Sequence, residues 1–452
     1  MPKEWEEGLI CPIHKKGDPL TCSNYRGITL LNIGYKIFSN IVYMRLLPYA
    51  ERIIGNYQCG FREGKSTSDQ IHSLRQILQK TREYKIDTYH LFIDYKSAYD
   101  SINRDKLFDA MDEFGIPKKL VALTRATLTN VRCRVKLQGD LSESFYTQKG
   151  LRQGDALACL LFNLALEKVI RDSGIERRGT IFHKSIQILG YADDLDIVGR
   201  SERSIRDAFT SLDTEAQQMG LKINESKTKY MEVTRKPSKI EFFEIAGYKF
   251  KKVTEFKYLG SLITSDNNMS TEIHHRLLTA NRCYYGLQKQ LRSHHISLNT
   301  KKKLYKTLIR PVLLYGSETW AVGNTDRSRL DVFERKVLRT IYGPVNDDGC
   351  WRKRHNHEVY KLYRDPDVCR EIKARRVRWL GHILRKDEAD PCRKLTLTSP
   401  YGTRRVGRPQ LRWLDEVEKD IMETGIQGWK IKAQDRDVWR SVVGAVRAGT
   451  RL

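Results

Sequence analysis

The stretch Ser185–Gly199 reads SIQILGYADDLDIVG and places two apolar runs on either side of the tetrad Tyr191-Ala192-Asp193-Asp194. Apolar runs separated by a short polar break are typical of a β-hairpin, so we expect both carboxylates at its turn. Adjacent carboxylates repel each other unless a cation lies between them or one is protonated, which suits a divalent metal site. Asp is also common in ordinary solvated turns, so the tetrad needs partners elsewhere in the chain.

Two other stretches supply candidate partners. Tyr89–Ile93 predicts a short apolar strand that ends at Asp94, and a neighbouring strand would bring this third carboxylate to the hairpin turn. The turn Arg152-Gln153-Gly154-Asp155 precedes a strongly apolar helix, whose first N–H groups suit an anion or a polar ligand. Because the leucines of that helix are core residues, the candidates for a functional role in this stretch are Arg152, Gln153 and Gly154.

The charge of the chain indicates its class of partner. Of 452 residues, 81 are Lys or Arg and 55 are Asp or Glu, which gives a formal net charge of +26. A surface this basic attracts polyanions, so nucleic acid is the leading partner and a membrane surface is the alternative. The length allows about three domains.

The sequence favours an intracellular protein, without resolving nucleus from cytoplasm. The N-terminus has no apolar stretch of signal-peptide length. The longest apolar run, Leu157–Leu166, is too short to span a bilayer and contains Asn163. The nine cysteines are scattered and odd in number, which favours reduced thiols.

The N-terminal part carries a polar, cationic loop before a strand-like segment. Lys15, Lys16 and Arg26 are suited to holding phosphates, although each alone is an ordinary surface cation. Gly64-Lys65-Ser66 resembles the end of a P-loop, but Cys59 stands where the first glycine of that motif is required, which excludes the motif. A helix is expected to begin near Gln70.

From about Thr271 the pattern changes to helices, predicted at Ile273–Leu291, Thr300–Leu314 and Arg327–Tyr342. A composition shift at Gly343–Gly349 suggests a domain boundary. The following segment, Glu371–Trp413, is rich in Lys and Arg, with Trp379 and Trp413 among them. Such tryptophans either stack on nucleic-acid bases or belong to the core. The Cys and His residues of this region do not have zinc-finger spacing.

These motifs, in this order, resemble the reverse transcriptases of non-LTR (LINE-like) retrotransposons, of the invertebrate type. The matching stretches are PIHKKGD (12–18), NYRGITLLN (24–32), QCGFREGKSTSDQI (58–71), FIDYKSAYDSI (92–102), KGLRQGDALACLLFNLALE (149–167), GYADDL (190–195), GLKINESKTK (220–229) and FKYLGS (256–261). Resemblance continues in RRVRWLGHILRK (375–386), GRPQLRWLDEVEKDI (407–421) and AQDRDVWR (433–440). It covers essentially the whole chain.

The resemblance implies a function and a fold. We expect an RNA-directed DNA polymerase that adds deoxynucleoside triphosphates to a DNA primer on an RNA template, with no membrane partner and no inferable protein partner. The implied fold is α+β, a right-hand polymerase of fingers, palm and thumb, with an antiparallel palm sheet and a helical basic C-terminal region. Residues 1–270 would form fingers and palm, 271–345 a thumb-like region, and 346–452 a nucleic-acid-binding region.

The resemblance also assigns roles to the site residues. Asp94 and Asp193 would bind two Mg²⁺ or Mn²⁺ ions directly, with Asp194 in support, and Lys227 would be the general acid for the leaving pyrophosphate. Tyr99 lies where the family carries an aromatic gate that excludes a ribose 2′-hydroxyl. Nucleotide-binding roles fall on the finger cations Lys16 and Arg26 and on the turn residues Arg152, Gln153 and Gly154.

The chain also departs from the family pattern. Ala156 and Cys159 stand where proline is common, which predicts altered packing at the start of the helix. The first polymerase motif lies close to the first residue, so we expect a copy that lacks the N-terminal endonuclease. Two alternatives stay open: an RNA-directed RNA polymerase, against which Tyr99 argues, and a catalytically idle, element-derived protein that only binds RNA or DNA.

Overall fold

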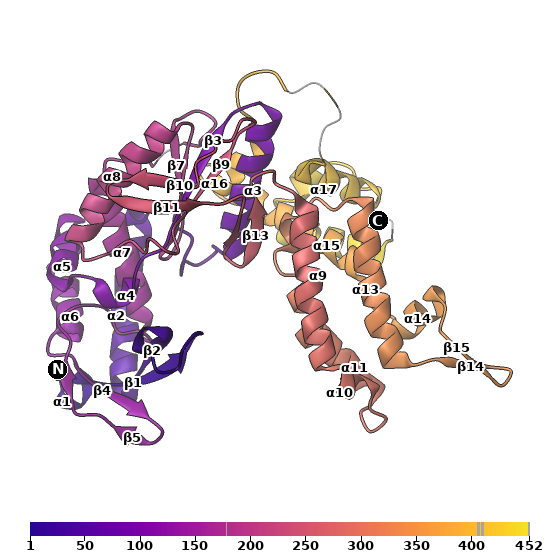
Figure 1. The fold of residues 1–452 in the computed structure, drawn as a ribbon, viewed down its shortest axis with the longest axis horizontal. Helices are drawn as coiled ribbons and strands as arrows, with labels where there is room; N and C mark the ends of the chain where they lie inside the picture. The colour runs from indigo at the N-terminus through magenta and orange to yellow at the C-terminus, as the bar shows by residue number, and fades with distance from the viewer. Residues whose placement is uncertain (178, 405–406, 408–410, 451–452) are drawn as a thin grey trace. The chain divides into compact units, whose positions relative to one another are not determined.

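The computed structural model describes residues 1–177, 179–404, 407 and 411–450, and these form two compact units (Figure 1). Unit 1 comprises Met1–Thr67 and Asp87–Val253, and unit 2 comprises Ser68–Ile86 and Thr254–Leu452. Both mix helices with strands, and each is described by itself below.

The centre of unit 1 is a six-stranded sheet in the order β10-β11-β9-β3-β8-β7. Every neighbouring pair is antiparallel except β11 and β9, which run parallel, so the expected antiparallel sheet has one parallel pair. The expected hairpin is confirmed, since its two strands pair from Ile186 opposite Gly199 to Tyr191 opposite Asp194. The strands are β3 (Thr88–Ile93), β7 (Ile186–Tyr191), β8 (Asp194–Gly199), β9 (Lys229–Val233), β10 (Phe242–Ile245) and β11 (Tyr248–Lys252).

A second, five-stranded sheet in unit 1 contains the N-terminal segment. Its strand β1 pairs antiparallel with β2 and parallel with β4. Its strands are β1 (Glu7–His14), β2 (Tyr25–Leu31), β4 (Arg132–Leu137), β5 (Asp140–Leu141) and β6 (Phe145–Tyr146).

Helices complete the core of unit 1. Helix α7 begins after Asp155, whose side chain accepts from Leu157 N, as expected for an N-cap in front of an apolar helix. Helix α8 contacts β3, β7 and β8, and Figure 1 shows it beside the six-stranded sheet. The helices are α1 (Lys3–Glu6), α2 (Ile33–Ile53), α4 (Ala98–Ser101), α5 (Arg104–Glu113), α6 (Lys118–Leu128), α7 (Ala156–Asp172) and α8 (Glu202–Gln218), with a 3₁₀ turn at Cys22–Asn24.

Unit 2 is mainly helical, as the sequence predicts from Thr271 onward. Its elements are α3 (Thr67–Glu83), β12 (Glu255–Tyr258), β13 (Ser261–Thr264), α9 (Met269–Gly286), α10 (Gln288–Arg292), α11 (Leu298–Leu304), a π-helical turn (Tyr305–Ile309), α12 (Arg310–Leu313), a 3₁₀ turn (Ser317–Thr319), α13 (Asn324–Tyr342), β14 (Val345–Asp347), β15 (Cys350–Arg352), α14 (Asn356–Tyr363), α15 (Val368–Leu384), α16 (Pro391–Leu397), α17 (Trp413–Met422), α18 (Trp429–Lys432) and α19 (Arg436–Ala448).

Unit 2 differs from the sequence expectations in three respects. Helix α3 starts at Thr67, before the expected Gln70, and nearly all of it belongs to unit 2, where Lys80 donates to the carbonyls of Leu395 and Thr396. One apolar core continues from Ile273 to Ile372, across the boundary suggested near residue 345. A second core spans Ala374 to Val446.

The tryptophans of the basic segment are core residues. Trp379 and Trp413 are 9% and 1% exposed and pack with Trp439. The core alternative therefore holds for both, because neither offers a free face for stacking on a base. Arg405 and Arg408 of the same segment lie outside the described residues. In the part of the chain that is described, no helix is long and apolar enough to cross a membrane.

Candidate active site

Asp94 and the Tyr191–Asp194 tetrad meet at one end of the six-stranded sheet. Strands β3 and β8 are antiparallel neighbours, and Ile93 pairs with Leu195. This register brings Asp94, the residue after β3, beside Asp194, the first residue of β8. Ala192 and Asp193 form the turn between β7 and β8, with Ala192 in the left-handed region at φ +55°.

The carboxylates influence one another electrostatically. Desolvation, with the charge of Asp94 in addition, raises the pKa of Asp193. Desolvation and the charges of Asp193 and Asp94 raise the pKa of Asp194 to about 6, although Asp194 is an exposed residue. A divalent cation such as Mg²⁺ or Mn²⁺ would offset the repulsion between these carboxylates, and their oxygens are the ligands that such hard cations prefer.

Asp94 has two partners from the segment between α8 and β9. Asn224 Nδ2 donates to Asp94 Oδ2 at 2.9 Å, and Asn224 N donates to the carbonyl of Asp94 at 2.7 Å. Lys227 Nζ lies 3.4 Å from Asp94 Oδ2 and is largely exposed. Lys227 thus lies beside Asp94 at this end of the sheet. Asn224 was missed as a site residue, although it lies in the family-like stretch GLKINESKTK (220–229), which was the available signal.

Tyr99 lies close to the same carboxylates. Its ring stacks on Phe162 of α7, with centroids 4.6 Å apart. Burial raises the pKa of Tyr99, and the neighbouring Cys159 and Asp193 add to the rise. Arg26, an exposed residue of β2, has a charge that acts on both Tyr99 and Asp193.

The turn before α7 is fixed against β2. Thr29 N donates to the carbonyl of Gln153 at 2.8 Å, and Gln153 Nε2 donates to Asp100 Oδ1 at 3.3 Å. Gly154 has φ +116°, and a Cβ there would lie 2.7 Å from the carbonyl oxygen of Thr29. This position therefore requires glycine for both its conformation and its close approach.

Arg152 and Lys16, two of the expected nucleotide-binding residues, do not lie as that role would require. Arg152 is 4% exposed, and its guanidinium donates to the carbonyls of Trp5 and Glu6 while lying over the ring of Tyr35. These contacts give Arg152 a structural task in holding the turn. Lys16 lies in an exposed loop after β1, and the cations whose charges act on Asp100 are its neighbour Lys15 and Arg26.

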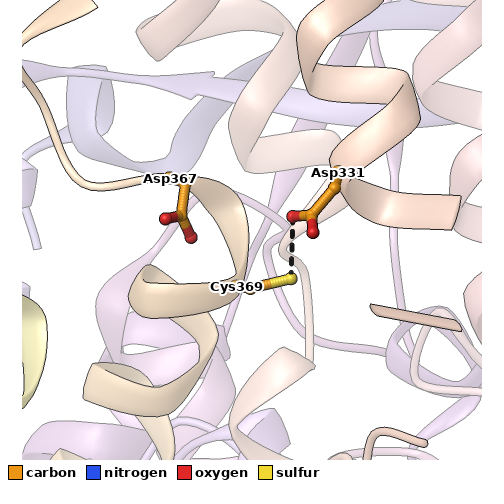
Figure 2. Close-up of side chains that lie close together, drawn as sticks. All are labelled: Asp331, Asp367 and Cys369. Atoms are coloured by element: carbon orange, nitrogen blue, oxygen red, sulfur yellow. Dashed lines mark hydrogen bonds between the residues drawn. The ribbon is translucent and has the colours of Figure 1, made fainter. Parts of the chain in front are cut away.

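A second group of possible metal-ligating side chains lies in unit 2. Asp331 of α13, Asp367 at the N-cap of α15 and Cys369 in its first turn offer atoms within 4.8 Å of one another (Figure 2). The Cys369 thiol donates to Asp331 Oδ1 at 3.1 Å, and Asp367 Oδ1 accepts from Arg370 N as the helix cap. Because these contacts account for the cluster, we assign it a structural role.

Comparison with known proteins gives a family match over residues 13–263, to the model described as "Reverse transcriptase (RNA-dependent DNA polymerase)". This region contains every expected catalytic and nucleotide-binding residue. It extends into unit 2 as far as the β12–β13 hairpin.

Curated relatives come from mobile elements. The "Probable RNA-directed DNA polymerase from transposon BS" of Drosophila melanogaster is 25% identical over 75% of this chain and 39% of its own length. The "RNA-directed DNA polymerase from mobile element jockey" of the same fly is 23% identical over 76% of this chain and 38% of its own length. The chain thus spans about two fifths of these relatives. Among solved structures, apo telomerase of Candida tropicalis matches 75% of this chain and 63% of its own, at 14% identity and a TM-score of 0.45.

Proposed function

Because this chain belongs to the reverse transcriptase (RNA-dependent DNA polymerase) family, we propose that it extends a DNA primer with deoxynucleotides on an RNA template, as a non-LTR retrotransposon polymerase. The observation that carries the proposal is the meeting of Asp94 with the Asp193-Asp194 turn through the pairing of β3 and β8. The resemblance to non-LTR elements is confirmed by relatives such as jockey and the element R2 of Popillia japonica.

Asp94 and Asp193 would hold two Mg²⁺ or Mn²⁺ ions, with Asp194 in support. When bound, such ions activate the primer 3′-hydroxyl and stabilise the departing pyrophosphate. Asn224 orients the Asp94 carboxylate through its hydrogen bond to Oδ2. Lys227, an exposed cation beside the carboxylates, is placed to give a proton to the leaving pyrophosphate.

The remaining residues bind and select the nucleotide. Tyr99, stacked on Phe162, blocks the space that a ribose 2′-hydroxyl would need. Arg26 supplies positive charge for the triphosphate, together with a lysine of the 15–16 pair. Gln153 and Gly154 form the floor of the nucleotide site, and Arg152 holds that floor from behind.

We further propose a right-hand architecture for the whole chain. Residues 1–270 supply fingers and palm, 271–345 the thumb-like region, and 346–452 a basic region that binds nucleic acid. Unit 1, which covers residues 1–67 and 87–253 of the first assignment, supports it because this unit contains Asp94, Asp193, Asp194 and Lys227 together.

The test is extension of a DNA primer on an RNA template with Mg²⁺ or Mn²⁺, comparing the parent with Asp193→Ala. We expect the variant to lose at least about 10³-fold in rate, because it lacks a ligand of the ions that stabilise the transition state. Equal rates in the two proteins would contradict the mechanism. Preferred incorporation of ribonucleotides would indicate an RNA polymerase, and RNA binding without extension by either protein would indicate an idle nucleic-acid-binding protein.

A further inference from the structure

Ala192 holds an unfavourable conformation immediately before the catalytic carboxylates. Its φ of +55° lies in the left-handed region, which disfavours residues with a Cβ. Ala192 is buried, and its methyl side chain has no polar group that could stabilise this conformation. The surroundings must therefore fix the conformation that directs Asp193 and Asp194.

The side chain of Gln58 contacts both polar backbone groups of Ala192. Gln58 Oε1 accepts from Ala192 N at 2.8 Å, and Gln58 Nε2 donates to the Ala192 carbonyl at 3.1 Å. Gln58 Oε1 also accepts from Gly60 N at 2.9 Å. Gln58 is 1% exposed, so these hydrogen bonds form without competition from water.

Backbone contacts align Gln58 with the hairpin. Gln58 forms a parallel bridge with Gly190, in which Cys59 N donates to the Gly190 carbonyl and Gly190 N donates to the Tyr57 carbonyl. Gly60 approaches the turn so closely that a Cβ there would lie 2.2 Å from Ala192 N. We call residues 55–60 the clamp segment.

Helix α7 holds the clamp segment in place. Asn163 Nδ2 donates to the Gly60 carbonyl at 2.8 Å. Glu167, one turn later, accepts from Gly55 N at 3.0 Å and from the Tyr57 hydroxyl. Asn163 and Glu167 are each 1% exposed. The clamp segment is thus a rigid support, and its contact with the turn is fixed by buried hydrogen bonds.

From these contacts we infer that Gln58 is a positioning residue for nucleotide addition: its side-chain amide fixes Ala192 and thereby orients the Asp193 and Asp194 carboxylates toward the metal ions. The inference rests on the proposed function. A glutamine is required because the position needs an acceptor for two N–H groups and a donor for one carbonyl. Leucine offers neither, and an ionised glutamate offers no donor.

The matched control is Gln187. It is also a buried glutamine, it lies on β7 of the same hairpin, and its Oε1 accepts a backbone hydrogen bond from Ile181 N at 2.8 Å. Gln187→Leu removes one buried side-chain hydrogen bond at the opposite end of the strand from the turn, whereas Gln58→Leu removes three. Loss of buried hydrogen bonds should therefore lower the unfolding midpoint of both variants, and more in Gln58→Leu.

The experiment compares the parent, Gln58→Leu, Gln58→Glu, Gln187→Leu and Asp193→Ala in two measurements. The first is kcat for primer extension, with the Mg²⁺ concentration that gives half-maximal rate. The second is the affinity for Mn²⁺, measured from the electron paramagnetic resonance signal of the free ion. This measurement does not require an active enzyme. Thermal unfolding midpoints show whether each variant is folded.

We expect Gln58→Leu to lower kcat by about 10- to 100-fold, because misplaced groups lose rate steeply. We expect both Gln58 variants to weaken Mn²⁺ binding by about tenfold, as loss of a residue that orients ligands does. Gln187→Leu should match the parent in both. The inference is overturned if Gln58→Leu and Gln187→Leu bind Mn²⁺ with equal affinity. It is also overturned if the parent binds Mn²⁺ no more tightly than Asp193→Ala. If the parent does not extend primers but Gln58→Leu still binds Mn²⁺ more weakly than Gln187→Leu, only the proposed polymerase activity is contradicted.

Discussion

Tyr99 offers a direct test of sugar selection. Its ring is held against Phe162, so the space next to the site is filled by a fixed aromatic face. Tyr99→Val removes the ring, and we expect the ratio of kcat/KM for ribonucleotides to that for deoxynucleotides to rise about tenfold or more. Tyr99→Phe keeps the ring and should keep the selectivity of the parent. Single-nucleotide extension with matched dNTP and rNTP measures both variants, and unchanged selectivity in Tyr99→Val would remove the gate assignment.

Glu334 should make the stability of unit 2 depend on pH. This carboxyl is fully buried and accepts from the Tyr305 hydroxyl at 2.8 Å and from Val368 N at 2.9 Å. Burial raises its pKa to about 7. Since the folded protein holds this proton more tightly than the unfolded chain, the stabilisation is complete below pH 4.5 and is lost as the pH rises through 7.

The size of this effect is about 3 kcal/mol, from a difference of some 2.5 pKa units. Glu334→Gln cannot titrate, so its unfolding midpoint should change less between pH 5 and pH 7.5 than that of the parent. Thermal unfolding at both pH values, taken as the difference between parent and variant, isolates this one group. Parallel pH profiles would show that Glu334 titrates normally.

The packing of α15 against α19 depends on a glycine. A Cβ on Gly381 would lie 2.0 Å from Nε1 of Trp439, and this nitrogen donates to the Val377 carbonyl at 3.0 Å. Gly381→Ala would separate the two helices and break that hydrogen bond, so we expect a loss of about 1–3 kcal/mol in unfolding free energy.

Gly444 in α19 is the control for helix propensity. A Cβ there meets no atom within 4 Å, so Gly444→Ala should stabilise the protein by up to about 1 kcal/mol. Urea denaturation of both variants measures the contrast. If both substitutions moved stability in the same direction, packing at Gly381 would not decide the effect.

The net charge of +26 predicts how the whole protein binds its template. Neutralising phosphates releases counterions, so log affinity should fall linearly with log salt concentration. For about six phosphate contacts, the loss between 50 and 200 mM salt is about 10³-fold. Filter binding of an RNA–DNA template–primer measures it, and Asp193→Ala should show the same slope because it keeps every Lys and Arg. Affinity independent of salt would contradict the electrostatic account.

The two units differ in how far the sequence predicts them. In unit 1, the hairpin at 186–199, the strand before Asp94 and the apolar helix α7 after the Arg152–Asp155 turn follow from short stretches with strong hydrophobic patterns. In unit 2, the helical segments between residues 269 and 342 also follow from periodicity. The sequence does not predict the assignment of α3 to unit 2 or the burial of Trp379, because both depend on packing between segments distant in the sequence.

The sequence alone determined the 186–199 hairpin, the strand before Asp94, the helical character of the chain from Thr271, the family and the candidate carboxylates, because hydrophobic period and motif order are local properties of the chain. Only the tertiary structure revealed that Arg152 holds backbone carbonyls, that Asn224 orients Asp94, and that Gln58 fixes Ala192. Each of these contacts joins residues far apart in the chain. A local pattern cannot specify such a contact, since it forms only when strand register and helix packing bring a particular donor and acceptor within about 3 Å.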